Sequence, residues 1–450
     1  ANEHPLAMDI EASIVEGVFR NLKISGKVDW RNKQDNFNID LVLKDGSITP
    51  FENIFEGLAS NFSGSVDSRL ALTGNFDKPL LAGHVNLKDV SFNVEYLQAR
   101  YTLNDRIKIS QSLINLDDVS INDEEGHSAK AQGVIKHDLF ENFVLDLSIV
   151  EARNILAMNT TKEDNELFYG KAYGSGSIQF KGPLENIYIN IDANSEKGTK
   201  IYIPVYSEGD NALVEYVSFV DQSNTVFKRG KRDVEGITMD MKFRITEDAE
   251  FELLFDELLD DKIYGRGLGS VKIEMNSFGD FFMFGDFEIT EGYYPFSSPM
   301  LVSERFILKK GGKIRWDGDP YNAFIDMEAN IRRSKANPYH LMLGSPFVAD
   351  EKEKFQGEVD VDVQLFLRGE LFNPDITFGI DLPNNASIGG SSEFLSVFNR
   401  VKNDVDELNR QVFSLVTFGS FSPTNFFAYE STGFASNLSQ TVNNSLSSFI

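Results

Sequence analysis

The residue types that most often carry catalysis or bind metals are few and scattered in this chain. Its five histidines, His4, His84, His127, His137 and His340, show none of the spacings by which histidines ligate zinc. A serine nucleophile would need a glycine-flanked turn between a strand and a helix, and no segment has that pattern. The sequence contains no cysteine, which excludes disulfides and thiolate chemistry. We therefore expect a protein that is not an enzyme and that has no catalytic residue, metal or cofactor.

Three other segments could bind a ligand, and each has a simpler interpretation. Residues 265–269 (Gly-Arg-Gly-Leu-Gly) resemble a phosphate loop but lead into an apolar strand rather than into the helix that such a loop requires. A turn between strands is therefore favoured. The acidic segments 122–126 and 256–261 could bind calcium weakly, but neither has the spacing of a calcium-binding loop between helices. Solvated clusters of charge are the favoured interpretation.

Most of the chain instead shows alternating apolar and polar side chains. In residues 358–367, an apolar row at the odd-numbered positions is interleaved with Asp360, Asp362 and Gln364. Successive side chains of a strand point to opposite faces, so this pattern predicts a half-buried strand with one apolar and one acidic face. Similar patterns recur between residues 37 and 382, which makes a long apolar face the dominant feature of the sequence.

The apolar residues of these strands form the candidate binding surface. An open sheet this wide must curl, and with this face inward it would form a trough lined by Val, Ile, Leu and Phe side chains. We predict a groove lined by Phe37, Ile39, Leu41, Val85, Leu87, Phe143, Leu145, Leu147, Ile187, Ile189, Ile191, Val271, Ile273, Met275, Ile325, Met327, Val359, Val361, Val363, Leu365, Ile376, Phe378 and Ile380.

The composition limits the possible partners. The chain has 450 residues, a formal net charge of −26 and a pI near 4.6. A surface this acidic repels nucleic acid, so we expect no nucleic-acid partner. No run of about 18 apolar residues predicts a membrane-spanning helix, and no signal peptide opens the sequence. Because the first strands are expected within a few residues of Ala1, we expect a fragment of a longer protein.

A loose repeat organises the expected strands. Residues 64–83, 176–187 and 364–376 each contain an apolar strand, a glycine, a short turn with a proline, and a second apolar strand. Glycine permits the tight turn, and proline blocks further strand pairing at that point. Repeats of this kind are typical of elongated folds. We predict an all-β chain with strands of about five to ten residues, arranged as an elongated curled open β-sheet (a β-taco) with a hydrophobic groove.

The character of the sequence changes after Pro383. Apolar residues between Phe394 and Leu415 recur at helical spacing and predict one amphipathic helix that ends near Gly419. Apolar residues between positions 438 and 449 predict a second short helix. These helices would either cap the sheet and hide its edge or dock on a protein partner. The candidate docking residues are Phe394, Phe398, Val412, Phe413, Phe421, Phe426 and Phe427.

Several short motifs lie in a fixed order in the second half of the chain. They are residues 263–269 (Ile-Tyr-Gly-Arg-Gly-Leu-Gly), 285–289 (Gly-Asp-Phe-Glu-Ile), 291–296 (Glu-Gly-Tyr-Tyr-Pro-Phe), 306–320 and 408–416 (Leu-Asn-Arg-Gln-Val-Phe-Ser-Leu-Val). Together these motifs resemble the C-terminal domain of the TamB family, within the wider AsmA-like group. The acidic composition, rich in Phe and Asn, is similar to that of the Bacteroidetes branch.

The resemblance implies a curled sheet whose hydrophobic groove spans part of the periplasm, similar to bridge-like lipid transfer proteins. It also implies a TamA-like outer-membrane barrel as the partner. Members of the family usually begin with an inner-membrane helix and end in strands with a terminal aromatic residue. Neither feature is found in this sequence, so we expect the chain to lack its anchor and its last strands.

Three functions are compatible with these observations. The expected one is a phospholipid conduit between the inner and outer membranes, located in the periplasm, in which acyl chains slide along the groove. The second is a scaffold or chaperone for outer-membrane proteins, whose strands would pair with an open sheet edge. The third is a structural β-solenoid with a sealed core. We expect groove repeats in residues 1–240, the TamB C-terminal sheet in residues 241–383 and a helical segment in residues 384–450.

Overall fold

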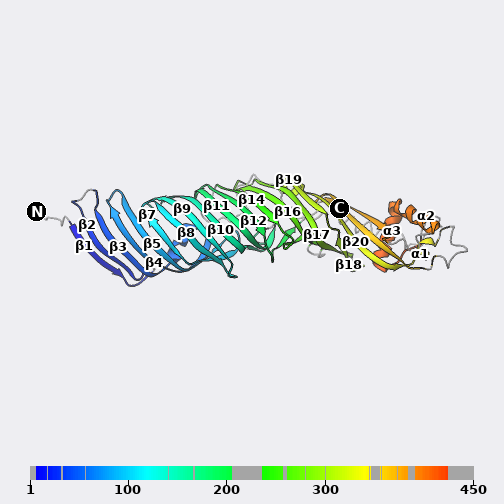
Figure 1. Cartoon of the computed structure of the whole chain (residues 1–450), viewed down its shortest axis with the longest axis horizontal. Helices are drawn as coiled ribbons and strands as arrows, with labels where there is room; N and C mark the ends of the chain where they lie inside the picture. The colour runs from blue at the N-terminus through cyan, green and yellow to red at the C-terminus, as the bar shows by residue number, and fades with distance from the viewer. Residues whose placement is uncertain are drawn as a thin grey trace. The chain divides into compact units, whose positions relative to one another are not determined.

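The computed structural model describes residues 7–423, with the exception of residues 18, 32–33, 56, 140, 166–167, 205–235, 257–260, 279, 299–300, 344, 346–354, 356, 372 and 384–390. The chain divides into two compact units. Unit 1 comprises residues 1–201, 217–249 and 270–283, and unit 2 comprises residues 202–216, 250–269 and 284–450. The predicted fold class is confirmed, because the described chain consists mainly of β-strands and its α-helices lie towards the C-terminus (Figure 1).

Unit 1 is a sheet of mostly antiparallel strands that lie side by side in chain order (Figure 1). Its strands are β1 (Ala7–Ile14), β2 (Leu22–Asp29), β3 (Phe37–Ser47), β4 (Ala59–Gly74), β5 (Pro79–Val94), β6 (Ala99–Leu103), β7 (Arg106–Ser110), β8 (Leu113–Asp123), β9 (Ser128–Asp138), β10 (Glu141–Thr160), β11 (Tyr169–Pro183), β12 (Ile187–Ser195) and β14 (Ile237–Ile245). Three strands have residues in both units: β13 (Lys200–Pro204), β16 (Asp261–Asn276) and β17 (Phe281–Ser298).

Strand pairing in unit 1 follows the sequence closely. Strands β1 to β5 pair in succession, and β5 then pairs along its length with both β6 and β7. Both of these short strands pair with β8, and β9 to β12 continue the antiparallel order. The pairing between β12 and β14 is parallel. The predicted turns of the repeat are confirmed at Gly74 and Gly182, whose positive φ angles of 84° and 107° suit glycine.

A repeated five-residue motif bends three of these strands. Residues 43–47 (Leu-Lys-Asp-Gly-Ser), 87–91 (Leu-Lys-Asp-Val-Ser) and 116–120 (Leu-Asp-Asp-Val-Ser) each place an aspartate in the left-handed region. The three left-handed residues are Asp45 (φ 54°), Asp89 (φ 48°) and Asp118 (φ 56°). The strand register shifts beside Asp45 and Asp118, which is the geometry of a β-bulge. Bulges bend a strand and increase its twist, so this motif lets a long strand turn without ending.

Polar contacts fix the conformation of these bends. The backbone N–H of Asp45 donates to Oδ1 of Asp67 at 2.8 Å, and Lys88 forms an ion pair with the same aspartate at 2.6 Å. The backbone N–H of Asp89 donates to Oδ1 of Asn104 at 2.6 Å, and the Asn104 amide donates back to Oδ1 of Asp89 at 2.7 Å. These contacts explain why aspartate, which tolerates the left-handed region better than most residues, recurs at the bend.

Unit 2 combines a sheet with three helices. Its remaining strands are β15 (Glu250–Asp256), β18 (Leu301–Leu308), β19 (Lys313–Gly318), β20 (Phe324–Ala336), β21 (Val359–Glu370) and β22 (Asn373–Asp381). The helices are α1 (Pro338–Met342), α2 (Ser392–Lys402) and α3 (Val405–Phe418). The α3 helix packs against α2 and against β18, β20, β21 and β22. Short 3-10 helices occur at Thr49–Phe55 and Pro320–Asn322.

Three predictions about local structure are wrong. Several strands are longer than expected, up to the 20 residues of β10, because bulges allow a strand to bend and continue. The single helix expected from Phe394 to Gly419 is two helices, since Asp404 caps α3 by accepting from the backbone N–H of Glu407 at 3.1 Å. The turn expected at residues 265–269 lies inside β16. The helix predicted between residues 438 and 449 lies outside the described residues.

Candidate functional site

The apolar face, by which we mean the face of the sheet carrying the predicted groove residues, is half-buried in unit 1. Most of its candidate residues keep part of their surface in contact with solvent. The half-buried ones are Phe37, Leu41, Val85, Leu87, Phe143, Leu145, Leu147, Ile189, Ile191, Ile273 and Met275. The buried ones are Ile39, Ile187 and Val271. No separate layer of secondary structure covers this face within the described residues of unit 1.

Small buried clusters lie among the half-buried residues of unit 1. Leu43, Val66 and Val90 form one cluster, against which Val85 and Leu87 pack. Another consists of Val119, Ile121, Ala129 and Ala131, and Ile149 of β10 packs against it. Because Leu145 and Leu147 share the parity of Ile149 on β10, they extend the same face. The face therefore combines small buried clusters with apolar side chains that remain partly accessible beside them.

An aromatic row on the apolar face was not predicted from the sequence. Phe55 and Phe62 stack with ring centroids 5.4 Å apart, and Phe62 stacks on Phe92 at the same distance. Phe92 lies next to Tyr101, whose hydroxyl donates to the backbone oxygen of Leu156 at 2.7 Å. The sequence contains a signal for this row, because Phe62, Phe92 and Tyr101 are aromatic residues at neighbouring positions on strands that pair directly. Flat rings at this spacing give a smooth apolar surface across three strands.

A buried carboxylate anchors the hairpin between β8 and β9. The side chain of Asp123 accepts hydrogen bonds from the backbone N–H groups of Leu156 and His127, each at 2.8 Å, and from Nδ1 of His127 at 3.0 Å. Desolvation raises the pKa of Asp123, but these hydrogen bonds together outweigh it and lower the pKa below its ordinary value. The expectation of a solvated acidic turn at residues 122–126 is therefore wrong for Asp123, which is buried. Nearby Glu125 pairs with Lys171 and Tyr173.

In unit 2 the apolar face is covered. Ile325, Val361, Val363 and Ile380 are each 0 % exposed. Met327 and Leu365 are also buried, whereas Val359, Ile376 and Phe378 are half-buried. The α2–α3 pair covers part of this face, because α3 packs directly on β20, β21 and β22. This part of the apolar face is a closed core in the structure.

The predicted docking residues belong to that cover. Phe394, Phe398, Val412 and Phe421 are buried, and the ring centroids of Phe398 and Phe421 lie 6.4 Å apart. Phe413 is half-buried, and Phe426 and Phe427 lie outside the described residues. The buried residues hold the helices on the sheet, so an external partner could reach them only after the helices move.

The glycines of residues 265–269 have a packing role within β16. A Cβ atom on Gly265 would lie 2.3 Å from Cζ of Phe251, and one on Gly267 would lie 2.4 Å from Cζ of Phe287. The two phenylalanine rings meet edge to face with centroids 4.8 Å apart, and both side chains are buried. The glycines thus leave room for aromatic rings to lie across the strand. This contact gives the glycine motif a structural role and leaves it no phosphate-binding geometry.

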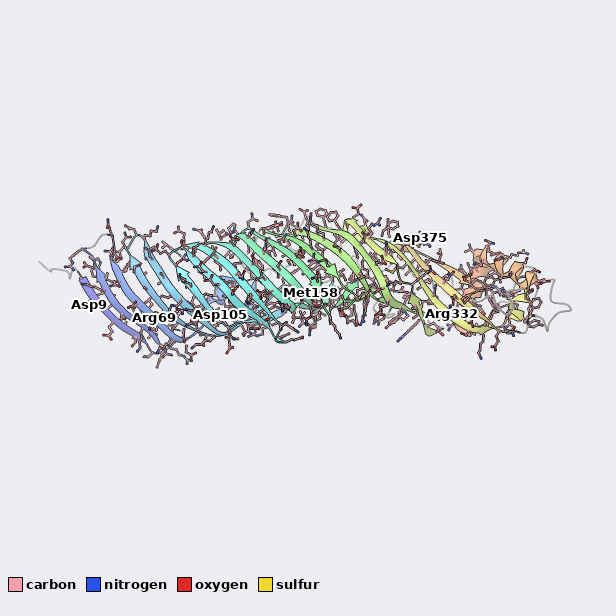
Figure 2. All side chains as sticks on the ribbon, in the orientation of Figure 1. Asp9, Arg69, Asp105, Met158, Arg332 and Asp375 are labelled. Atoms are coloured by element: carbon pink, nitrogen blue, oxygen red, sulfur yellow. The ribbon has the colours of Figure 1, made fainter. Side chains whose placement is uncertain are left out.

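The opposite face of unit 2 is charged and extensively ion-paired. Arg332, labelled in Figure 2, forms an ion pair with Asp362 at 2.7 Å across β20 and β21. Arg368 pairs with Asp326 at 3.3 Å, and Lys309 pairs with Glu328 at 2.9 Å. The acidic face predicted from the sequence is therefore partly neutralised by neighbouring cations.

The described residues contain neither a metal centre nor a membrane span of the helical kind. No three His, Cys, Asp or Glu side chains gather there closely enough to hold a metal ion. No helix in that part of the chain is both long and apolar enough to cross a membrane.

These features define a sheet protein with an apolar face and a C-terminal helical cover, and comparison with known families agrees. A family model for the TamB C-terminal domain matches residues 117–450, which is more than half of the chain, so the chain belongs to the TamB family. No curated protein matches it. Membership confirms the resemblance found in the sequence and assigns the chain to the cell envelope. It points to a role in outer-membrane protein assembly or lipid transport, in association with outer-membrane proteins.

Proposed function

We propose that the protein conducts phospholipids between the inner and outer membranes, with their acyl chains held on the apolar face of unit 1. The observation that carries this proposal is the half-burial of that face. Val85 and Leu87 pack against a buried cluster and still present apolar surface, and Leu145, Leu147 and Ile189 are likewise half-buried. A core residue of a sealed sandwich would be fully covered instead, as Val363 is in unit 2.

The energetic requirement for such a surface is large. Each buried CH₂ group is worth about 0.8 kcal/mol, so two acyl chains of about sixteen carbons lose on the order of 25 kcal/mol when exposed to water. A continuous row of apolar side chains lowers that barrier because a chain can move from one strand to the next while it stays covered. The headgroup would remain in water, so the transfer needs no charged site within the row. It also needs no catalytic residue, and we propose that the protein is not an enzyme.

The partner proposed for this chain is a TamA-like outer-membrane barrel, with the protein located in the periplasm. Membership of the TamB family, which associates with outer-membrane proteins, supports this proposal. A formal net charge of −26 disfavours simple adsorption to an anionic membrane, so contact with a protein is the better supported route to the outer membrane.

Transfer of a fluorescent phospholipid between phosphatidylcholine vesicles tests the proposal. Leu147→Asp places a carboxylate on the apolar face of β10, and Ser148→Asp places one on the neighbouring position of the same strand. We expect Leu147→Asp to lower the transfer rate at least tenfold, because a passing acyl chain would have to displace the water around the new carboxylate. Ser148→Asp should stay within about twofold of the parent.

Circular dichroism on both variants confirms that each remains folded. Equal transfer by Leu147→Asp and the parent would contradict the conduit. If the protein instead acts as a scaffold for outer-membrane proteins, the parent itself will transfer no phospholipid above the rate without protein, and neither variant will differ from it.

A further inference from the structure

A cation stands in the apolar row of β20. Ile325, Met327, Ala329 and Ile331 alternate along the buried side of this strand, and Arg333 occupies the next position on the same side. Its register partner is Val361, which is fully buried. An arginine at such a position is unusual, because a charge on an apolar surface requires partners that compensate for its lost hydration.

The partners of Arg333 belong to helix α3 and to strand β18. Its Nε donates to the backbone oxygen of Leu415 at 3.0 Å, and its Nη2 donates to the backbone oxygen of Val416 at 2.7 Å. The same guanidinium forms an ion pair with Glu304 at 3.0 Å. Glu304 precedes the fully buried Phe306 by two positions, so it too lies on the apolar side of its strand.

This contact stabilises the C-terminal end of α3. The last carbonyl groups of a helix have no partner within the helix, and the negative end of the helix dipole favours a cation there. Arg333 meets both requirements from the surface of the sheet. The apolar packing of Leu415 and Val416 is thereby supplemented by a polar contact at one end of the helix.

A second set of polar contacts joins α3 to the segment that follows it. The Gln411 side chain donates to the backbone oxygen of Ser422 at 2.8 Å and accepts from the backbone N–H of Ser422 at 2.9 Å. Ser414 donates to the backbone oxygen of Ser420, also at 2.8 Å. These bonds are internal to the helical cover, so α3 and residues 420–423 are held together as one piece, whereas Arg333 joins that piece to the sheet.

We propose that α2–α3 is a displaceable cover over the apolar face of unit 2, and that Arg333 is the residue that positions it in the closed state. Displacement would uncover the part of the face that includes Val361, Val363 and Ile380, giving unit 2 an accessible apolar surface like that of unit 1. The α3 helix and an acyl chain then compete for the same residues. The inference rests on the proposed function for the identity of that ligand. The cover regulates the site, because its position determines how much of the apolar face is accessible.

Thiol labelling measures the opening of the cover without any ligand. The sequence contains no cysteine, so Val363→Cys introduces a single reporter beneath α3 and Leu253→Cys a single reporter elsewhere in the core of unit 2. Arg333→Gln removes the positioning cation. Arg332→Gln is the matched control, because Arg332 is the adjacent residue and pairs with Asp362 on the opposite face.

We expect Arg333→Gln to raise the maleimide labelling rate of the reporter at position 363 roughly tenfold or more, since two charge-assisted hydrogen bonds and an ion pair are lost. Arg332→Gln should leave that rate within about twofold, and the reporter at position 253 should stay protected in both variants. Arg333→Lys keeps the charge but cannot donate two hydrogen bonds in the bidentate geometry of a guanidinium, so it should give an intermediate labelling rate. An unchanged rate in Arg333→Gln, or equal increases at the two reporter positions, would overturn the inference.

Native mass spectrometry with dioleoyl phosphatidylcholine then separates this inference from the proposed function. Lys402 and Asp381 form an ion pair at 3.5 Å, so cysteines at these two positions can join α2 to β22 through a short, reducible thiol crosslinker. We expect Arg333→Gln to bind more phospholipid than the parent, and the crosslinked pair to bind less than its reduced form. If phospholipid binds the parent but crosslinking and Arg333→Gln have no effect, the cover is not displaceable. If no phospholipid binds to the parent, the proposed function fails while the labelling result stands.

Discussion

The apolar faces of the two units share one sequence pattern and differ in what covers them. In unit 1, Leu145, Leu147 and Ile189 are half-buried, and no helix covers them within the described residues. In unit 2, Val361 and Val363 are fully buried, and α3 packs on their strand. Alternation along a strand therefore specifies which side chains share a face, but it does not specify whether that face is open.

The difference assigns separate roles to similar residues. An apolar side chain in a closed core contributes to stability, and its replacement is felt through unfolding. A half-buried side chain contributes less to stability and remains available to a ligand. Function and stability should consequently separate when equivalent substitutions are made in the two units.

The largest expected effect comes from a charge placed in the closed core. Val363→Asp should lower the free energy of unfolding by about 4 kcal/mol or more, because a carboxylate would be buried without a partner. Leu147→Asp in unit 1 should cost about 1–2 kcal/mol, since its carboxylate can reach water. Urea denaturation monitored by circular dichroism measures the free energy of unfolding of both variants. Equal losses would mean that the two faces are equally enclosed.

A smaller effect is expected from adding a methyl group to a glycine. In Gly267→Ala the new Cβ would lie 2.3 Å from the backbone oxygen of Glu288, and we expect a loss of about 2–3 kcal/mol. Gly174 of β11 is the control from unit 1, where the nearest atom to a new Cβ is the Asn194 oxygen at 3.6 Å. Gly174→Ala should change stability by no more than about 0.5 kcal/mol. Thermal or chemical unfolding of the two variants decides whether β16 is packed as tightly as the structure indicates.

The bends of unit 1 should show a still smaller effect. Asp89 has a φ of 48°, so Asp89→Ala should lose about 1 kcal/mol from backbone strain and from its bond with Asn104. Asp89→Asn, which tolerates the same backbone region, should lose less. If Asp89→Ala and Asp89→Asn have the same midpoint of denaturation, the left-handed bend does not limit stability.

The smallest expected effect depends on pH. The pKa of Asp123 is lowered in the folded chain, so its contribution to stability is present above the unfolded value near 3.9 and is lost as pH falls through the folded value. The parent should therefore lose stability below about pH 4 more steeply than Asp123→Asn, although the variant is less stable at neutral pH. Parallel slopes for the two proteins would show that Asp123 does not contribute to this acid sensitivity.

Much of the architecture was predictable because it depends on local patterns. Alternation marked the apolar face from Phe37 to Ile380, glycine and proline marked the turn after Gly74, and Gly419 ended the helical segment with a φ of 65°. The bends at Asp45, Asp89 and Asp118 were missed because Leu-x-Asp-x-Ser reads as an ordinary strand pattern with a polar residue. Only its recurrence could have indicated a special backbone conformation.

The cover over unit 2 was harder to predict, because it depends on contacts between residues far apart in the sequence. Amphipathic spacing predicted helical structure around Phe398 and Val412, but spacing alone could not show which surface they pack against. No sequence pattern could predict the role of Arg333, because it depends on contacts with Leu415 and Val416, which lie more than 80 residues away.

Photo-crosslinking tests the central claim most directly, because it asks which face touches lipid. A benzophenone amino acid at Leu145 would lie on the apolar face of unit 1, and the same group at the exposed Asp146 would lie on the opposite face of the same strand. After irradiation with phosphatidylcholine vesicles, we expect mass spectrometry to find phospholipid adducts at position 145 and at most traces at position 146. Equal yields at the two positions, or no adduct at position 145, would contradict the account.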